Sequence, residues 1–256
     1  MDLQLIIPMS GFGSRFINAG YQIPKFLIEI ENKPIIKHII DSFPELKSVV
    51  FICNKDHLKS EKLDLRKKLL NIKNDAKIYS IEPHKKGPVY SLIKVLDKLN
   101  PNLQTIVNYC DFGWEWNFSL FEKHIKDTDC DGCLVSYKGF HPHMMRNTNY
   151  GYSKTSGLNV IDIREKNSFT QNPMKEYASS GTYYFKTAKL MKKYLKKTIE
   201  NNLEINGEFY VSMSFLPMIK DKLKVNVFEI EKFLQWGTPE DLEEYLWYSR
   251  AFKEKS

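Results

Sequence analysis

Short apolar runs alternate with segments of helical periodicity in the first half of the chain. Runs rich in β-branched residues occur at 3–8, 48–53, 77–82 and 104–109. Between them, apolar residues recur every three or four positions after Pro34, in a segment at 56–70 that Asp56 would cap, and from Val89 to Leu99. This β-α-β-α order predicts a parallel sheet with helices on both faces.

The second half of the chain is richer in strands. Strands are expected at 132–138, 150–154, 158–165, 178–186 and 224–230. Gly157 marks a hairpin turn, helices are expected at 187–200 and 208–220, and a last helix begins at Thr238-Pro239-Glu240-Asp241 with a cap, a proline and an acid in the first turn. Residues 1–256 are therefore predicted to form one α/β domain with a mixed, mostly parallel central sheet flanked by helices.

Composition and charge exclude several classes of protein. The 256 residues carry 38 Lys+Arg and 31 Asp+Glu, a net charge of +7. The lysines are spread along the chain, so we expect a small polyanionic ligand and not a nucleic acid. No apolar stretch is long enough for a membrane helix and no basic region precedes a signal core, which predicts a cytoplasmic protein without a membrane partner. The oligomeric state stays open, with a homodimer as one alternative.

Four cysteines are expected to be reduced thiols, because they are too few for a disulfide framework in a chain of this length. Cys130 and Cys133 have the spacing of half a zinc site. No second pair of this kind follows, so buried thiols are favoured over zinc.

Candidate ligand-binding residues follow directly after the first apolar run. Glycines at 11 and 13 allow backbone N–H groups to converge on an anion, and Arg15 and Lys25 add two cations. A P-loop requires a lysine directly after its last glycine and a dinucleotide fingerprint requires a third glycine, and the segment has neither. It therefore predicts a loop that binds a triphosphate, formed by Met9, Ser10, Gly11, Phe12, Gly13 and Ser14.

Asp111 directly follows the apolar run at 104–109. Its carboxylate is expected at the carboxyl edge of the sheet, beside the triphosphate loop. Mg²⁺ binds one or two carboxylates together with phosphate oxygens and water, so Asp111 is the predicted metal ligand.

The signature G-x-G-x-R followed by P-K resembles that of nucleotidylyltransferases, which couple a nucleoside triphosphate to a phosphorylated small molecule. Further matches to this family are Gly87 to Leu92, Asp111, Tyr150-Gly151, Glu165-Lys166, Gly181 and Gly237 to Asp241. The resemblance implies a Rossmann-like, GT-A-like nucleotidyltransferase fold that binds the triphosphate with its N-terminal half and the acceptor with its C-terminal half.

The resemblance also implies roles for individual residues. Gly87 and Pro88 lie beside the base, and Lys166 binds the acceptor phosphate. Because that phosphate is already anionic, no general base is needed, and Arg15, Lys25 and Lys166 act with Mg²⁺. The residues expected to contact the acceptor are Tyr150, Gly151, Glu165, Gly181 and Trp236.

Trp236 departs from the family pattern, because sugar-nucleotide members usually carry a metal-binding aspartate there. Tryptophan cannot bind Mg²⁺. Either Asp111 holds the metal with phosphates and water, or Glu208 or Asp162 supplies the second carboxylate. An aromatic residue at this position also predicts an acceptor other than an ordinary sugar.

Glu82 stands where uridylyl- and thymidylyltransferases tend to carry glutamine. An ionised carboxylate only accepts hydrogen bonds, and cytosine offers an amine donor where uracil offers a carbonyl, so Glu82 favours CTP. A solvent-facing glutamate at a strand end is the alternative.

The whole-chain pattern most resembles the cytidylyltransferases of capsule phosphoramidate synthesis, which implies CTP and phosphorylated L-glutamine as substrates and pyrophosphate as a product. Phosphocholine or a sugar 1-phosphate is the alternative acceptor. A glycosyltransferase of related fold would keep a D-x-D motif, which Asp111-Phe112-Gly113 lacks. A nucleotide-binding regulator without catalytic activity is the remaining alternative.

Overall fold

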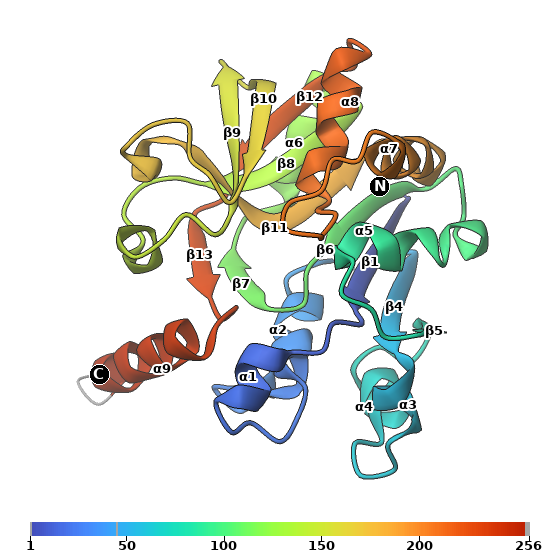
Figure 1. Ribbon diagram of the computed structural model, residues 1–256, viewed down its shortest axis with the longest axis vertical. Coiled ribbons are helices and arrows are strands. Elements are labelled where there is room, and N and C mark those ends of the chain that lie inside the picture. The colour runs from blue at the N-terminus through green and yellow to red at the C-terminus, as the bar shows by residue number, and fades with distance from the viewer. Residues whose placement is uncertain (1, 45, 254–256) are drawn as a thin grey trace.

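A computed structural model describes residues 2–44 and 46–253, and its centre is a nine-stranded sheet (Figure 1). The strands are β1 (Leu3–Met9), β4 (Ser48–Asn54), β5 (Lys77–Ile81), β6 (Gln104–Asn108), β8 (Gly132–Tyr137), β9 (Gly151–Ser156), β10 (Asn159–Glu165), β11 (Tyr177–Phe185) and β12 (Val225–Glu229). Their order is β5-β4-β1-β6-β11-β8-β12-β10-β9. Neighbours from β5 to β6 are parallel, as are β8 and β12, and the other pairs are antiparallel, so the sheet is mixed as predicted.

Two small antiparallel pairs stand apart from this sheet, and the apolar pattern did not reveal them. They are β2 (Glu29–Ile30) with β3 (Lys33–Pro34), and β7 (Phe112–Glu115) with β13 (Lys232–Gln235). The second pair matters for the site. Strand β7 begins directly after Asp111, and its pairing with β13 places the end of β13 beside this segment.

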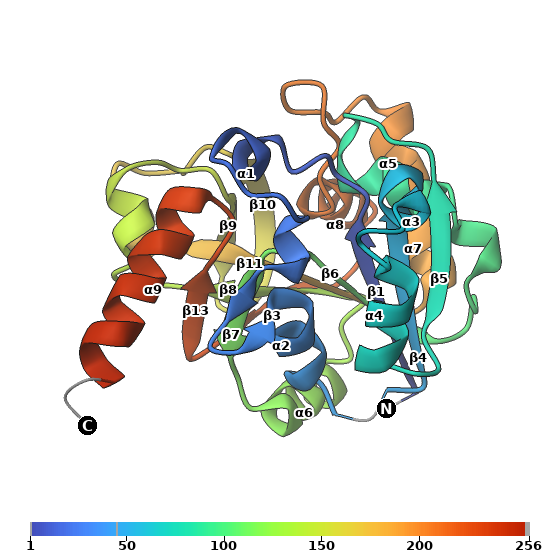
Figure 2. The ribbon, with the colours of Figure 1, turned by 90° about the horizontal axis from the view of Figure 1, so that it is seen from below.

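Helices cover both faces of the sheet (Figure 2). They are α1 (Ser14–Asn18), α2 (Ile35–Asp41), α3 (Lys55–Lys59), α4 (Leu65–Ile72), α5 (Gly87–Ile93), α6 (Phe118–Thr128), α7 (Ala188–Glu200), α8 (Phe215–Lys220) and α9 (Pro239–Lys253). The apolar faces of α2, α4 and α6 share one core cluster, and those of α5, α7 and α8 share the other. Strand β1 contributes to both clusters, Leu5 and Ile7 to the first and Ile6 to the second, because successive side chains of a strand point to opposite faces.

Three predicted helices are wrong in extent. The helix expected from Val89 to Leu99 ends at Ile93, and a separate 3₁₀ turn at Leu96–Lys98 follows it. The segment at 56–70 is two helices, α3 and α4, and the residue that caps the first is Asn54, whose side chain accepts the Asp56 N–H at 2.8 Å. The helix predicted at 208–220 begins only at Phe215, after a 3₁₀ turn at Ser212–Ser214. The residues before that turn are held by another element, since the backbone of Phe209 bonds to those of Lys86 and Val89.

Several predicted helix and turn boundaries are confirmed. Thr187 caps α7 by accepting the Leu190 N–H at 3.1 Å, and Gly157 adopts a φ of 59° in the hairpin between β9 and β10. At the start of α9, the Thr238 hydroxyl accepts the Asp241 N–H at 3.2 Å as a helix cap and donates to the Asp241 carboxylate at 2.7 Å. Within the described residues, no helix combines the length and apolar composition that crossing a bilayer requires. All four cysteines are buried free thiols.

Candidate active site

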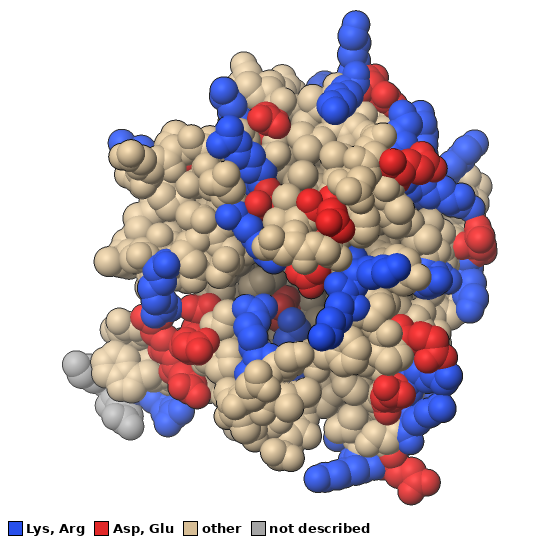
Figure 3. Space-filling model, in the orientation of Figure 1, with Lys and Arg blue, Asp and Glu red and all other residues tan. Residues whose placement is uncertain are grey.

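A cavity of about 750 Å³ lies at the carboxyl ends of β1 and β6 and extends towards β9, β10 and β11. Figure 3 shows it as a hollow at the centre of one face, with Lys and Arg side chains on its rim. Every residue that the sequence assigned to the site lines this cavity except Glu82 and Trp236. The fold therefore gathers into one space predicted site residues that lie far apart in the sequence, from Met9 to Gly181.

The glycines of the predicted triphosphate loop leave room for a ligand. Gly13 has a φ of 67°, a left-handed conformation that favours glycine. A Cβ atom on Gly11 or on Gly13 would meet no other atom within 4 Å. The loop backbone is therefore open on its cavity side, as close approach of a phosphate requires.

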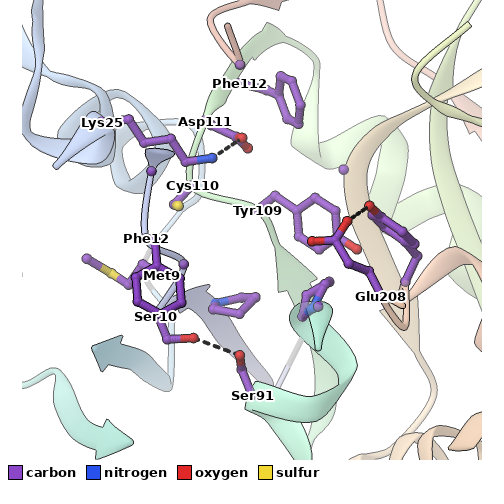
Figure 4. A pocket seen from close by; sticks show the side chains of 18 of the residues that line it. Met9, Ser10, Phe12, Lys25, Ser91, Tyr109, Cys110, Asp111, Phe112 and Glu208 are labelled. Carbon is purple, nitrogen blue, oxygen red and sulfur yellow. Dashed lines mark hydrogen bonds and ion pairs between the residues drawn. The ribbon is translucent and has the colours of Figure 1, made fainter. Parts of the chain in front are cut away.

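Lys25 and Asp111 form an ion pair across the cavity wall, although they come from segments far apart in the sequence (Figure 4). The exposed fractions of their side chains are 22% and 11%. Burial is the largest single effect on the pKa of Lys25 and lowers it. The raising effects, of which the charge of Asp111 is the largest, together outweigh burial, so the net shift is upward and Lys25 stays cationic at neutral pH. Burial also raises the pKa of the neighbouring Cys110 thiol to about 12, which keeps that thiol neutral.

Asp111 fits a Mg²⁺ ion better than the other carboxylates that the sequence raised. It lies on the cavity wall beside the triphosphate loop, whereas Asp162 does not line the cavity and accepts the N–H of Ile163 at 2.8 Å. Glu208 lines the cavity beside Lys166 and Tyr210, on the side expected to bind the acceptor. Within residues 2–44 and 46–253, no cluster of three or more His, Cys, Asp or Glu side chains could hold a metal. An ion at Asp111 would therefore draw its other ligands from phosphates and water.

Glu165 and Lys166 lie in the half of the cavity that β9, β10 and β11 form. Burial raises the pKa of Glu165 to about 7, although Ser212 donates a hydrogen bond to its carboxylate. A Cβ atom on Gly151 would lie 2.8 Å from Glu165 Oε2, so only glycine leaves room for this carboxylate. Lys166 Nζ is 3.4 Å from Glu208 Oε2 and 4.7 Å from the centre of the Tyr210 ring.

Gly181 interrupts β11 at the cavity. Its φ is 80°, and the pairing of β11 with β8 shifts register between Ser179 and Thr182. Such a bulge bends a strand and redirects its side chains. A Cβ on Gly181 would lie 3.1 Å from the ring of Phe112, so this glycine allows the aromatic ring to reach the cavity.

Several residues on the cavity wall were not assigned from the sequence. They include His57, His84, Lys85, Ser91, Tyr109, Cys110, Phe112, Asn149, Ser179, Tyr183, Asn206 and Tyr210, together with Glu208, which the sequence raised only as an alternative metal ligand. The sequence did offer a reason to assign Tyr109, Cys110 and Phe112 to the site, because they flank Asp111 at the end of a strand. For His84 and Tyr210, which lie in irregular segments, no periodicity or motif indicated a role.

Two predicted site residues do not reach the cavity. The Glu82 side chain is 73% exposed and forms an ion pair with Lys55, as in the solvent-facing alternative. Trp236 is buried behind the wall, where its ring packs against His38, and a Cβ on Gly113 would lie 2.3 Å from the ring. The expectation that Trp236 contacts the acceptor is thereby corrected: this side chain supports the β7–β13 pair.

Known structures share this architecture. A nucleoside-diphosphate-sugar pyrophosphorylase from Vibrio cholerae RC9 is similar with a TM-score of 0.73 at 21% identity, over 94% of this chain and 99% of that one. A UDP-glucose pyrophosphorylase from Acinetobacter baumannii gives 0.71 at 14% identity, over 97% and 93%. The inositol-1-phosphate CTP transferase from T. maritima gives 0.72 at 14% identity, over 95% and 94%. At these identities, the likeness shows a common fold.

Sequence comparison defines the family directly. A sequence model of the nucleotidyl transferase family matches residues 5–241, a span that includes the triphosphate loop, Lys25, Asp111, Glu165 and Lys166. The chain therefore belongs to the nucleotidyl transferase family.

Proposed function

We propose that this nucleotidyltransferase joins CTP to a phosphorylated acceptor and releases pyrophosphate. The observation that carries the proposal is one cavity that holds Arg15, Lys25 and Asp111 on one side and Lys166 on the other. Two anionic substrates repel each other in water, and cations placed on both sides of a cavity offset that repulsion while they hold the reacting groups in line.

In the proposed reaction, an acceptor phosphate oxygen attacks the α-phosphorus of CTP. The new P–O bond forms as the bond to the β-phosphate oxygen breaks, and pyrophosphate leaves with the electron pair. Arg15 and Lys25 stabilise the negative charge that grows on the triphosphate, and Lys166 orients the acceptor phosphate. A Mg²⁺ ion held by Asp111 would neutralise further phosphate charge.

Two considerations support CTP as the nucleotide. The whole-chain motif pattern resembles cytidylyltransferases, and one protein of the same fold is named as a CTP transferase that acts on inositol 1-phosphate.

Charge on the acceptor side of the cavity supports phosphorylated L-glutamine as the acceptor. Glu165 and Glu208 line this side together with Lys166. Glu208, and Glu165 in its ionised form, would repel a phosphorylated molecule that carried only negative charge. An α-amino acid offsets them with its ammonium group and offers a carboxylate to a cation.

A sugar 1-phosphate is the second candidate acceptor, because the similar proteins from Vibrio cholerae and Acinetobacter are named for sugar nucleotides. A pyrophosphate-release assay with CTP separates the candidates when phosphorylated L-glutamine, phosphocholine and several sugar 1-phosphates are compared. The proposal predicts the highest kcat/KM for phosphorylated L-glutamine. Activity on a sugar 1-phosphate alone would contradict the proposed acceptor and retain the nucleotidyl transfer.

Replacing Lys166 with alanine is expected to raise the acceptor KM by about 10- to 100-fold, since a hydrogen bond to a charged group contributes ~1.5–3 kcal/mol. The KM for CTP should change little. Steady-state kinetics with each substrate varied in turn measure both constants. Lys154→Ala, an exposed lysine of β9 outside the cavity, is the control. An unchanged acceptor KM in Lys166→Ala would remove this lysine from the acceptor site.

Glu165 should make stability depend on pH. Its pKa rises from 4.5 to about 7 on folding, so between these values the folded chain holds a proton that the unfolded chain has lost. The free energy of unfolding should therefore fall by about 3 kcal/mol as the pH rises from 4.5 to 7, and then level off. Urea unfolding of the wild type and Glu165→Gln at several pH values measures this difference. Equal pH slopes in the two proteins would contradict the assignment.

A further inference from the structure

A chain of hydrogen bonds runs along one wall of the cavity, at the end of β1. Ser10 Oγ and Ser91 Oγ are 2.7 Å apart (Figure 4). His84 Nε2 lies 3.0 Å from Ser91 Oγ. The three residues come from the triphosphate loop, α5 and the segment before α5, and all three line the cavity. Ser10 is only 3% exposed and Ser91 only 2%, so bulk water does not compete for these bonds.

The backbone fixes the direction of this chain. The Lys86 N–H donates to His84 Nδ1 at 3.1 Å, so Nδ1 carries no proton. Burial, assisted by the charges of Lys94 and Lys86, lowers the pKa of His84, and the ring is neutral at pH 7. A neutral imidazole with a bare Nδ1 carries its proton on Nε2, and His84 therefore donates to Ser91.

The direction of donation continues from Ser91 to Ser10, on the nucleotide side of the cavity wall. Ser91 accepts the hydrogen bond of His84 and must donate its own hydrogen elsewhere. Among the residues that the structure describes, Ser10 is the acceptor within reach, so Ser91 donates to Ser10. Within residues 2–44 and 46–253, no further acceptor lies within reach of the Ser10 hydroxyl, so its hydrogen stays available to a ligand. We propose that His84, Ser91 and Ser10 form a directional relay that selects the base by presenting this donor to it.

The relay rests on the proposed use of CTP and explains its preference over UTP. Cytosine presents acceptors at both O2 and N3, whereas uracil carries a hydrogen on N3. A donor held in one direction therefore suits the N3 edge of cytosine and opposes that of uracil. Glu82, the base reader expected from the sequence, has its carboxylate outside the cavity and paired with Lys55.

Nucleotide binding without acceptor tests the relay. Titration calorimetry with Mg²⁺ gives the Kd values of CTP and UTP for the wild type, Ser91→Ala and Glu82→Gln. Ser91→Ala interrupts the relay and frees the Ser10 hydroxyl to rotate, so the preference for CTP over UTP should fall about tenfold. Glu82→Gln, the matched control at the edge of the same segment, should keep the wild-type preference.

The outcomes separate the relay from the proposed function. If the wild type binds CTP no better than UTP, the proposed nucleotide is wrong and the relay falls with it. If the wild type prefers CTP and Ser91→Ala keeps that preference, only the relay is wrong. A loss of preference in Glu82→Gln would assign base reading to Glu82 instead.

A second measurement reads the relay in the unmodified protein and uses a variant only to assign the signal. Nitrogen-15 NMR distinguishes the two histidine tautomers, and comparison with His84→Gln assigns the His84 signal among the six histidines. The relay predicts the Nε2–H tautomer of His84 at pH 7.5 with and without CTP. A proton on Nδ1 would reverse the chain and overturn the inference.

Discussion

Replacement of Lys25 with alanine is expected to lower kcat by about 10²- to 10³-fold, the range measured when an enzyme loses one group that stabilises transition-state charge. Lys25 is nearly buried on the cavity wall, keeps its charge through Asp111, and lies beside the triphosphate loop. Charge on the α-phosphate and the leaving pyrophosphate grows during the reaction, so the loss should fall on kcat more than on the KM for CTP.

Lys37→Ala is the matched control for this variant. Lys37 also pairs with an aspartate, Asp41, but on the surface of α2 and away from the cavity. Circular dichroism and Tm should confirm that both variants fold, because Lys25→Ala leaves Asp111 without its partner. A folded Lys25→Ala protein with kcat within a few-fold of wild type would exclude a role for Lys25 in the transition state.

Asp111→Asn should be at least as damaging, with a loss of about 100-fold or more in kcat/KM at all Mg²⁺ concentrations. Asparagine retains the size of the side chain and can still accept a hydrogen bond from Lys25, but it removes the charge that a hard cation requires. Activity assays over a series of Mg²⁺ concentrations measure the effect.

Asp162→Asn controls for the loss of an aspartate, because Asp162 does not line the cavity and bonds to its own backbone neighbour. It should keep wild-type activity. Recovery of Asp111→Asn at high Mg²⁺ would indicate that Asp111 only tunes affinity, and a wild-type rate in this variant would place the metal elsewhere.

The parallel half of the fold was predictable because its strands are buried on both faces. A strand such as Leu3–Met9, with all seven residues buried, leaves a run in the sequence that is apolar except for Gln4. Strands β7 and β13 left no such run, since each has an exposed residue and a glycine or polar residue among four positions. Their pairing depends on contacts between residues that lie more than 100 positions apart.

Helix predictions failed where tertiary contacts took precedence over periodicity. The segment from Glu208 to Val211 has helical spacing, but the backbone of Phe209 bonds to Lys86 and Val89 at the start of α5. A Cβ on Gly87 would lie 2.7 Å from the Phe209 backbone, so the two segments approach closely. No local pattern encodes such a contact.

The site was predictable where a backbone requirement or a strand end defined it. Gly13 and Gly181 have φ values of 67° and 80°, which glycine accommodates, and Asp111 follows a strand. The prediction failed for Glu82 and Trp236, whose assignment depended on aligned positions alone. An aligned position fixes the place of the backbone but not the direction of a side chain, and Glu82 turns outwards to Lys55.

Phosphorus-31 NMR of the complete reaction tests nucleotidyl transfer most directly. With the enzyme, Mg²⁺, CTP and phosphorylated L-glutamine, we expect a pyrophosphate signal and the two coupled signals of a new CDP-linked product, in equal amounts. EDTA should abolish both. Two results would contradict nucleotidyl transfer. One is the absence of pyrophosphate with folded enzyme and every acceptor tested, and the other is hydrolysis of CTP without a CDP-linked product.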